Sequence, residues 1–151
     1  MSLRISRADC SRIEETLRLF EGYLRFYRCE PAPEKARAFI VDRLSRQDSV
    51  IFLAERDGAC VGFTQLYPAF ASLSMAPSWI LNDLYVQPEG RGKGVATALM
   101  EAARQLAVDT GAAEICLQTA RDNNTAQRLY VGLGYQRDDQ FLVYTLPVPD
   151  S

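Results

Sequence analysis

A glycine-rich turn between an apolar run and a helical segment restricts the fold more than any other feature of the sequence. Three glycines, Gly90, Gly92 and Gly94, occupy alternate positions after the apolar run at 79–86. Glycine lets the backbone take positive φ angles and approach a ligand closely. The amides of such a turn, and those of the first helical turn that follows, lack helical acceptors and together attract an anion. The sequence therefore predicts a strand and then a helix, with a phosphate-binding site between them.

Three phosphate-binding patterns can be tested against this turn. The Walker pattern needs Ser or Thr directly after Gly-Lys, where this chain has Gly94. The dinucleotide pattern needs a final Gly or Ala, and its last position falls on Val95 or Thr97. The third pattern is Arg or Gln, two residues, Gly, one residue, and Gly or Ala, and it is met by Arg91, Gly94 and Ala96. The alternative that this segment is only a tight turn capped by glycines, and binds no ligand, stays open at this point.

Apolar periodicity elsewhere predicts one mixed α/β domain over residues 1–151. Helices are expected at 13–29, 33–44, 94–110 and 123–133. Strands are expected at 3–5, 50–54, 59–67, 79–86, 114–119 and 141–146. Asp57-Gly58 predicts a tight hairpin between the second and third strands. The segment 68–77 is rich in small residues, so we expect it to be a loop.

Charge, cysteine and histidine content exclude several classes of function. The 151 residues carry a net charge of −2 and no histidine. Because there is no positive field, we expect no nucleic-acid or membrane partner, and no apolar run has the length of a membrane span. The four cysteines show no metal-binding spacing, so we expect free thiols in a cytoplasmic protein and no metal site. A catalytic base must then be a carboxylate, a tyrosine, a lysine or a water.

A second motif lies on the helix expected at 123–133. Asn123 and Tyr130 are seven residues apart, which is two helical turns, so their side chains point the same way. Asn123 could cap the helix or hydrogen-bond a ligand amide. Tyr130 could give its hydroxyl proton to a departing thiolate or pack as a half-buried aromatic residue. Each motif alone leaves these alternatives open.

Together, the two motifs resemble the GCN5-related N-acetyltransferase (GNAT) superfamily. The turn from Arg91 to Ala96 is similar to its pyrophosphate loop. The residues similar to its second cofactor motif are Asn123, Ala126, Leu129, Tyr130 and 132–135. Segments 19–27 and 81–86 are further similar to the branch of yeast histone and polyamine acetyltransferases. The resemblance implies a GNAT fold with a mixed six- to seven-stranded sheet, about four helices, and strands at 79–86 and 114–119 that splay apart.

The resemblance also implies acetyl-CoA as the acetyl donor, bound between the two splayed strands. The backbone of Leu84, Tyr85 and Val86 would then hold the pantetheine arm. The residues expected at the pyrophosphate are Arg91, Gly92, Lys93, Gly94, Val95, Ala96 and Thr97. Asn123 and Tyr130 would contact the cofactor, and Tyr130 would protonate the sulfur of coenzyme A. The amine attacks directly, so the resemblance implies no acyl-enzyme.

The base that accepts the proton of the amine is expected on the strand at 79–86. Polyamine-acetylating members often carry Glu-Asp where this chain has Asn82-Asp83. Asp83 is therefore the candidate base, directly or through water, and Asn82 a residue that orients the substrate. The alternative is that Asp83 only hydrogen-bonds neighbouring backbone.

The acceptor pocket of such folds is lined by the first two helices and by the loop before the fourth strand, which is expected at 79–86. The substrate-contact candidates are Tyr23, Phe26, Tyr27, Glu30, Trp79 and Asn82. Aromatic faces and a carboxylate attract ammonium groups. We expect a small-molecule primary amine; a protein lysine or N-terminus, or a catalytically idle acyl-CoA sensor, stays as the alternative. A homodimer is also expected, because members often pair through their last strands.

Overall fold

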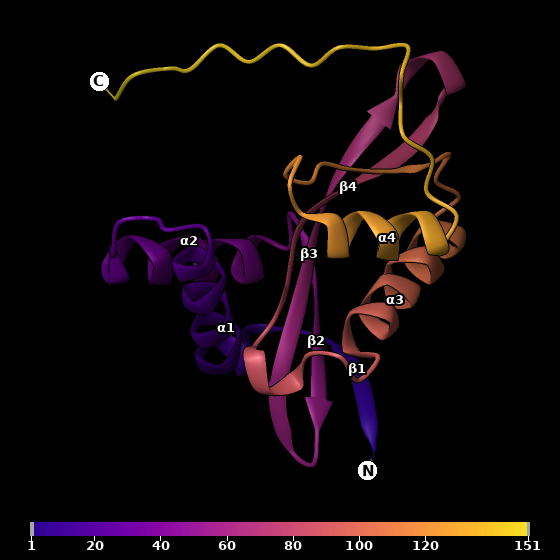
Figure 1. Cartoon of the computed structure of the whole chain (residues 1–151). Helices are drawn as coiled ribbons and strands as arrows, with labels where there is room; N and C mark the ends of the chain where they lie inside the picture. Colours follow the sequence, from indigo (N-terminus) through magenta and orange to yellow (C-terminus); the bar gives the residue numbers. More distant parts are fainter. Residues whose placement is uncertain (1, 151) are drawn as a thin grey trace. The chain divides into compact units, whose positions relative to one another are not determined.

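The structure is a computed structural model that describes residues 2–150 (Figure 1). The chain forms two compact units, with the boundary between Gln118 and Thr119. The elements of the first unit, in chain order, are β1 (Leu3–Arg7), η1 (Cys10–Arg12), α1 (Ile13–Phe26), α2 (Pro33–Arg46), β2 (Val50–Arg56), β3 (Ala59–Ala71), η2 (Ser72–Ser74), β4 (Ala76–Val86), η3 (Pro88–Gly90), α3 (Val95–Asp109) and β5 (Ile115–Leu117). The second unit contains α4 (Asn124–Gly132).

A five-stranded mixed sheet forms the centre of the first unit, in the order β1-β2-β3-β4-β5. The first four strands are antiparallel to their neighbours, and β5 is parallel to β4. Asp57 and Gly58 have φ angles of 54° and 84° in the turn between β2 and β3. Two successive positive φ angles match the twist of a tight hairpin. The mixed α/β class and this hairpin are confirmed.

Helices cover both faces of this sheet, with α1 and α2 on one face and α3 on the other (Figure 1). The core under α1 and α2 contains Leu19, Ile40, Leu53 and Phe63. The core under α3 contains Ala54, Val61, Val95 and Leu99. Burial of these side chains fixes which face each strand residue occupies, and with it the direction in which the polar residues of β3 and β4 point.

Two segments of the first unit differ from the prediction. The segment 68–77 is not a loop, because β3 runs to Ala71 and β4 begins at Ala76. Cross-strand pairing extends the hairpin although its small residues carry little strand signal. The first helix ends at Phe26 instead of near Cys29, because Arg28 adopts a left-handed φ of 58° that stops the helix.

The second unit contains the expected helix but not the expected last strand. Gly134 follows α4 with a positive φ of 97°, as predicted. Residues 141–146 form no strand, so the prediction there was wrong, and the described residues contain five strands instead of six or seven. A short run of apolar residues gives a segment the capacity to be a strand, but a strand also needs a neighbouring edge. Between residues 2 and 150, no helix is long and apolar enough to cross a membrane.

Candidate active site

The parallel pairing of β4 and β5 stops in the middle of β4. Trp79, Ile80 and Leu81 pair with β5, and the ladder ends at Leu81 and Leu117. From Asp83 to Val86, β4 pairs only with β3 among the described residues. Pairing between the two strands is limited to three residues of each, and their expected splaying stays a prediction. This limited pairing leaves a β4 edge whose backbone groups are available to an extended ligand.

A β-bulge lies where the pairing stops. Gln65 of β3 pairs with Asp83 and Leu66 with Leu81, so Asn82 is an extra residue in β4. Because Gln65 and Leu66 face opposite sides of the sheet, Leu81 and Asp83 also face opposite sides. The bulge therefore turns Asp83 toward α1 while Leu81 stays on the α3 side.

Asp83 is buried, with 3% of its surface exposed, and its carboxylate accepts two hydrogen bonds from amides. Gln65 Nε2 donates to Oδ2 at 2.6 Å and Asn82 Nδ2 donates to Oδ1 at 2.8 Å. Burial raises the pKa of Asp83 above its ordinary value, and hydrogen bonds from Asn82, Gln65 and Tyr23 oppose that rise. Thr64 Oγ1 donates to the carbonyl oxygen of Asp83 at 2.7 Å. A partly desolvated carboxylate of this kind is suited to accept a proton.

Tyrosine side chains gather beside this carboxylate. Tyr23 donates its hydroxyl to the carbonyl oxygen of Asn82 at 3.3 Å, and its ring packs edge-on against Tyr27 at 5.0 Å. Burial first, and then the negative charge of Asp83, raise the pKa of Tyr23 well above its usual range. The same two causes raise the pKa of Tyr67 to about 12. These phenols stay protonated at neutral pH, so they present hydrogen-bond donors and aromatic surface beside a carboxylate.

The glycine-rich turn is open at the positions where a ligand would approach. Gly92 and Gly94 have φ angles of 75° and 79°, and a Cβ at either position would meet no atom within 4 Å. Gly94 forms the N-cap of α3, and the side chain of Val95 is buried in the core. The turn and the first amides of α3 therefore fit a pyrophosphate group.

Two arginines fix the turn from its sides. Arg56, at the end of β2, donates through Nη2 to the carbonyl oxygen of Lys93 at 3.0 Å. Arg91 donates through Nε to the carbonyl oxygen of Val86 at 2.8 Å, and its guanidinium lies 5.5 Å from the centre of the Phe26 ring. Arg91 thus ties the turn to β4 and α1. Arg56 was not among the residues expected at the site.

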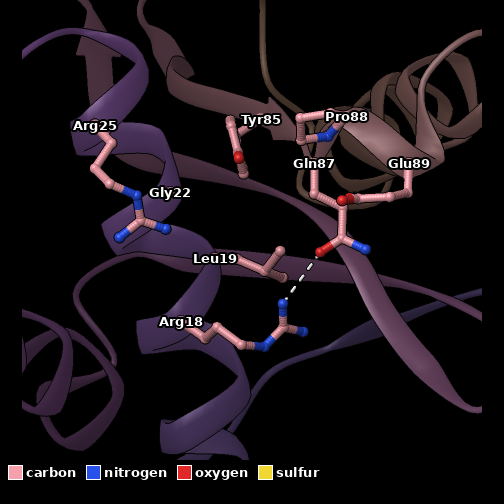
Figure 2. A pocket seen from close by; sticks show the side chains of 8 residues that line it. All are labelled: Arg18, Leu19, Gly22, Arg25, Tyr85, Gln87, Pro88 and Glu89. Carbon is pink, nitrogen blue, oxygen red and sulfur yellow. Dashed lines mark hydrogen bonds between the residues drawn. The ribbon is translucent and has the colours of Figure 1, made fainter.

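A pocket of about 190 Å³ lies between α1 and the segment that follows β4 (Figure 2). Its lining residues are Arg18, Leu19, Gly22, Arg25, Tyr85, Gln87, Pro88 and Glu89. Arg18 Nη1 donates to Gln87 Oε1 at 3.1 Å across the pocket. Gly22 lets Tyr85 approach α1, since a Cβ there would lie 2.8 Å from the phenol oxygen. This pocket was not predicted from the sequence, because its residues come from distant segments.

The remaining acceptor candidates lie in different places in the first unit. Trp79 is buried on the α3 side, where Nε1 donates to Thr110 Oγ1 at 2.9 Å. Phe26 and Tyr27 are half exposed, and Glu30 is exposed in the connection between α1 and α2. The structure therefore brings Tyr23, Asn82 and Asp83 together, and Trp79 faces away from them.

In the second unit, Asn123 caps α4. Its Oδ1 accepts a hydrogen bond from the Ala126 amide at 3.2 Å. Tyr130 is half-buried, and its ring centre lies 6.0 Å from that of Tyr135. The helix-cap alternative for Asn123 is realised, and Tyr130 is an aromatic neighbour of Tyr135.

Comparison with known proteins places this site in a family. The sequence model of the Acetyltransferase (GNAT) family matches residues 14–135. The chain belongs to this family. It is 42% identical over 147 residues to the uncharacterized N-acetyltransferase YhfO of Bacillus subtilis, a match that covers 97% of this chain and 99% of the relative.

Solved acetyltransferase structures share the fold. A crystal structure of a probable acetyltransferase is 41% identical, with a TM-score of 0.92 over 98% of this chain and 99% of the other. The aminoglycoside acetyltransferase AAC(6')-Iy, solved with the bisubstrate analog CoA-S-monomethyl-acetylneamine, is 19% identical, with a TM-score of 0.82 over 98% of this chain and all of the other. This GNAT protein is an N-acetyltransferase.

Proposed function

We propose that this enzyme moves the acetyl group of acetyl-CoA directly to a small-molecule primary amine. The observation that carries this proposal is the buried Asp83 carboxylate with Tyr23 beside it and Tyr67 near it. A carboxylate attracts an ammonium group, and aromatic rings favour a cation over their faces. Several curated aminoglycoside N(6')-acetyltransferases are related to this chain, which also supports a small cationic acceptor.

Asp83 serves as the base in this proposal. The amine nitrogen forms a bond to the thioester carbonyl carbon, and its surplus proton passes to the Asp83 carboxylate, directly or through one water. Burial raises the pKa of Asp83, which brings its basicity closer to that required near neutral pH. Asn82 is exposed and adjacent to this carboxylate, so we assign it to orient the substrate.

The donor would lie along the open edge of β4. Backbone groups of Leu84, Tyr85 and Val86 would hold the pantetheine arm along the edge that β5 leaves unpaired, where the carbonyl oxygen of Val86 also accepts a hydrogen bond from Arg91. The glycine-rich turn and the first amides of α3 would hold the pyrophosphate. Lys93 is exposed in this turn and adds positive charge there.

Tyr130 is proposed as the acid that protonates the sulfur when the carbon–sulfur bond breaks, and Asn123, the N-cap of α4 two helical turns away, is proposed as a further cofactor contact. The phenol of Tyr130 gives a proton and the departing thiolate takes it, so the charges balance. We propose one N-acetyltransferase domain over residues 1–151, because the family match at 14–135 includes residues of both units.

A panel of amines tests the proposed acceptor class. Thiol release from acetyl-CoA is measured with spermidine, lysine, kanamycin and a lysine-containing peptide. Turnover of spermidine, lysine or kanamycin with little turnover of the peptide supports the proposal. Turnover of the peptide alone would assign a protein lysine as the acceptor. Acetyl-CoA binding with no turnover of any amine would instead favour an acyl-CoA sensor.

A homodimer in the cytoplasm is a further part of the proposal. The segment after α4 exposes several apolar side chains, namely Phe141, Leu142, Val143, Tyr144, Leu146 and Val148. Such a surface is expected to be covered by another molecule. None of the four cysteines forms a disulfide within residues 2–150, as in a reducing compartment. Light scattering of the protein and of a Phe141→Ser/Leu146→Ser variant tests the dimer, which the variant should weaken.

A further inference from the structure

Gln65 of β3 hydrogen-bonds the Asp83 carboxylate from the interior of the protein. Gln65 is fully buried and belongs to no expected part of the site. Its Nε2 donates to Asp83 Oδ2 at 2.6 Å, and its Oε1 accepts from Ser49 Oγ at 2.8 Å. A buried side-chain amide is costly unless both of its ends are paired. This arrangement pairs them with the candidate base and with one hydroxyl.

The two ends of this amide are not equivalent for the carboxylate. An ionised carboxylate only accepts hydrogen bonds, so it needs the amide nitrogen and is repelled by the amide oxygen. Ser49, which directly precedes β2, engages that oxygen and keeps it turned away from Asp83. The chain Ser49–Gln65–Asp83 therefore selects one orientation of the amide and one charge state of the acid.

We propose that Gln65 is a positioning residue for the acetyl transfer, oriented by Ser49, which fixes the Asp83 carboxylate in its proton-accepting form. This proposal rests on the role of Asp83 in the proposed function. Burial alone drives Asp83 toward its neutral form, and a neutral acid cannot accept the proton of the amine. The donor from Gln65 opposes that effect from a position that never touches the substrate.

Thr64 provides a matched control within the same strand. It is as buried as Gln65, and it also hydrogen-bonds Asp83, but at the main-chain carbonyl oxygen. Thr64→Val removes a buried hydrogen bond to the same residue without changing what the carboxylate contacts. A merely structural role of Gln65 would make the two variants behave alike.

The test compares the pH–rate profiles of Gln65→Met, Ser49→Ala and Thr64→Val. The acceptor is kanamycin or whichever amine of the panel the enzyme acetylates fastest. Because every variant receives the same amine, the ionisation of the substrate cancels. Gln65→Met should lower kcat and move the acidic limb of the profile upward by roughly one to two pH units, the equivalent of a hydrogen bond to a charged group. Ser49→Ala should move the acidic limb in the same direction but by less, and Ser49→Thr should leave the limb at its wild-type position.

An independent measurement needs no acceptor. The loss of thermal stability caused by Gln65→Met should be larger at pH 7.5 than at pH 4, because the lost donor matters most when Asp83 is ionised. The loss caused by Thr64→Val should be the same at both pH values. If Gln65→Met fails to fold, the pH–rate profile and the pH dependence of stability are both measured with Ser49→Ala instead.

The results separate this proposal from the proposed function. If Gln65→Met lowers kcat without moving the acidic limb, and its stability loss does not depend on pH, the positioning role is overturned. If Asp83→Asn keeps the wild-type rate and limb, the assignment of the base fails. In that case the pH-dependent stability still decides whether Gln65 holds the carboxylate ionised.

Discussion

Arg56 Nη2 donates a hydrogen bond of 3.0 Å to the carbonyl oxygen of Lys93, and this bond joins the end of β2 to the glycine-rich turn. The turn contains two glycines with positive φ, so its backbone would otherwise be free to adopt many conformations. Ordering of the turn before acetyl-CoA arrives lowers the entropic cost of binding.

Arg56→Met should therefore weaken acetyl-CoA binding and leave kcat nearly unchanged. Loss of one hydrogen bond of this kind corresponds to a KM increase of about five- to tenfold. Steady-state kinetics with varied acetyl-CoA measures it. Arg46→Met, at the exposed end of α2, is the control and should behave like the wild type. An unchanged KM in Arg56→Met would show that the bond does not order the turn.

Asp83→Asn should lower kcat by about 10²- to 10⁴-fold, the contribution usual for a general base. It should not weaken acetyl-CoA binding, since Asp83 lies on the α1 side of β4 and the donor is assigned to its backbone edge. Rate and acetyl-CoA affinity are measured separately, by thiol release and by calorimetry. A variant that loses affinity and rate together would point to a structural role for Asp83.

The same substitution should change how stability depends on pH. Because the pKa of Asp83 is raised in the folded state, its contribution to stability is fully present below the unfolded pKa of about 4 and is lost as pH rises through the folded pKa. Asn does not titrate. Thermal unfolding at a series of pH values should show that the stability of the wild type, relative to that of Asp83→Asn, increases as the pH falls. A constant difference would mean that the pKa of Asp83 is not raised.

Tyr130→Phe should slow the reaction, by roughly ten- to a hundredfold, while acetyl-CoA still binds. The substitution removes only the hydroxyl, so packing against Tyr135 is kept. Tyr135→Phe is the matched control, and its rate should stay close to that of the wild type. Full activity of Tyr130→Phe at every pH would remove its assignment as the acid.

Gly22→Ala should destabilise the protein by roughly 1–3 kcal/mol, the usual cost of overpacking. An added Cβ would lie 2.8 Å from the Tyr85 phenol oxygen, so the ring must move. Gly132→Ala in α4 is the control, because a Cβ there meets no atom within 4 Å, and replacing a helical glycine usually stabilises.

A double variant identifies the cause of that destabilisation. If the clash with Tyr85 is responsible, Gly22→Ala combined with Tyr85→Leu should cost less than the sum of the two single changes, measured by urea unfolding. Additive costs would indicate that α1 is disturbed for another reason.

The sequence predicts local geometry well where a single residue imposes it. Pro33 begins α2, Asp57 and Gly58 form the hairpin, and Gly94 opens α3 with a positive φ. Each of these residues restricts or widens the allowed φ angles, so its effect needs no knowledge of the rest of the fold.

Features that depend on distant partners could not be predicted in this way. Gln65 lies in an apolar strand, and only the register of β3 against β4 shows that it faces Asp83. Arg56 is distant in sequence from the turn that it holds. The segment 141–146 has the pattern of a strand, but a pattern cannot say whether an edge is available to it.

The bulge at Asn82 also has a consequence for engineering and for comparison between relatives. Because Asn82 is the extra residue, a chain that lacks it would still place Leu81 and Asp83 on opposite sides of the sheet, as adjacent residues of a regular strand. A GNAT chain without the bulge should therefore be aligned to this one with a gap at Asn82, because an ungapped alignment would match residues on opposite sides of the sheet along one flank.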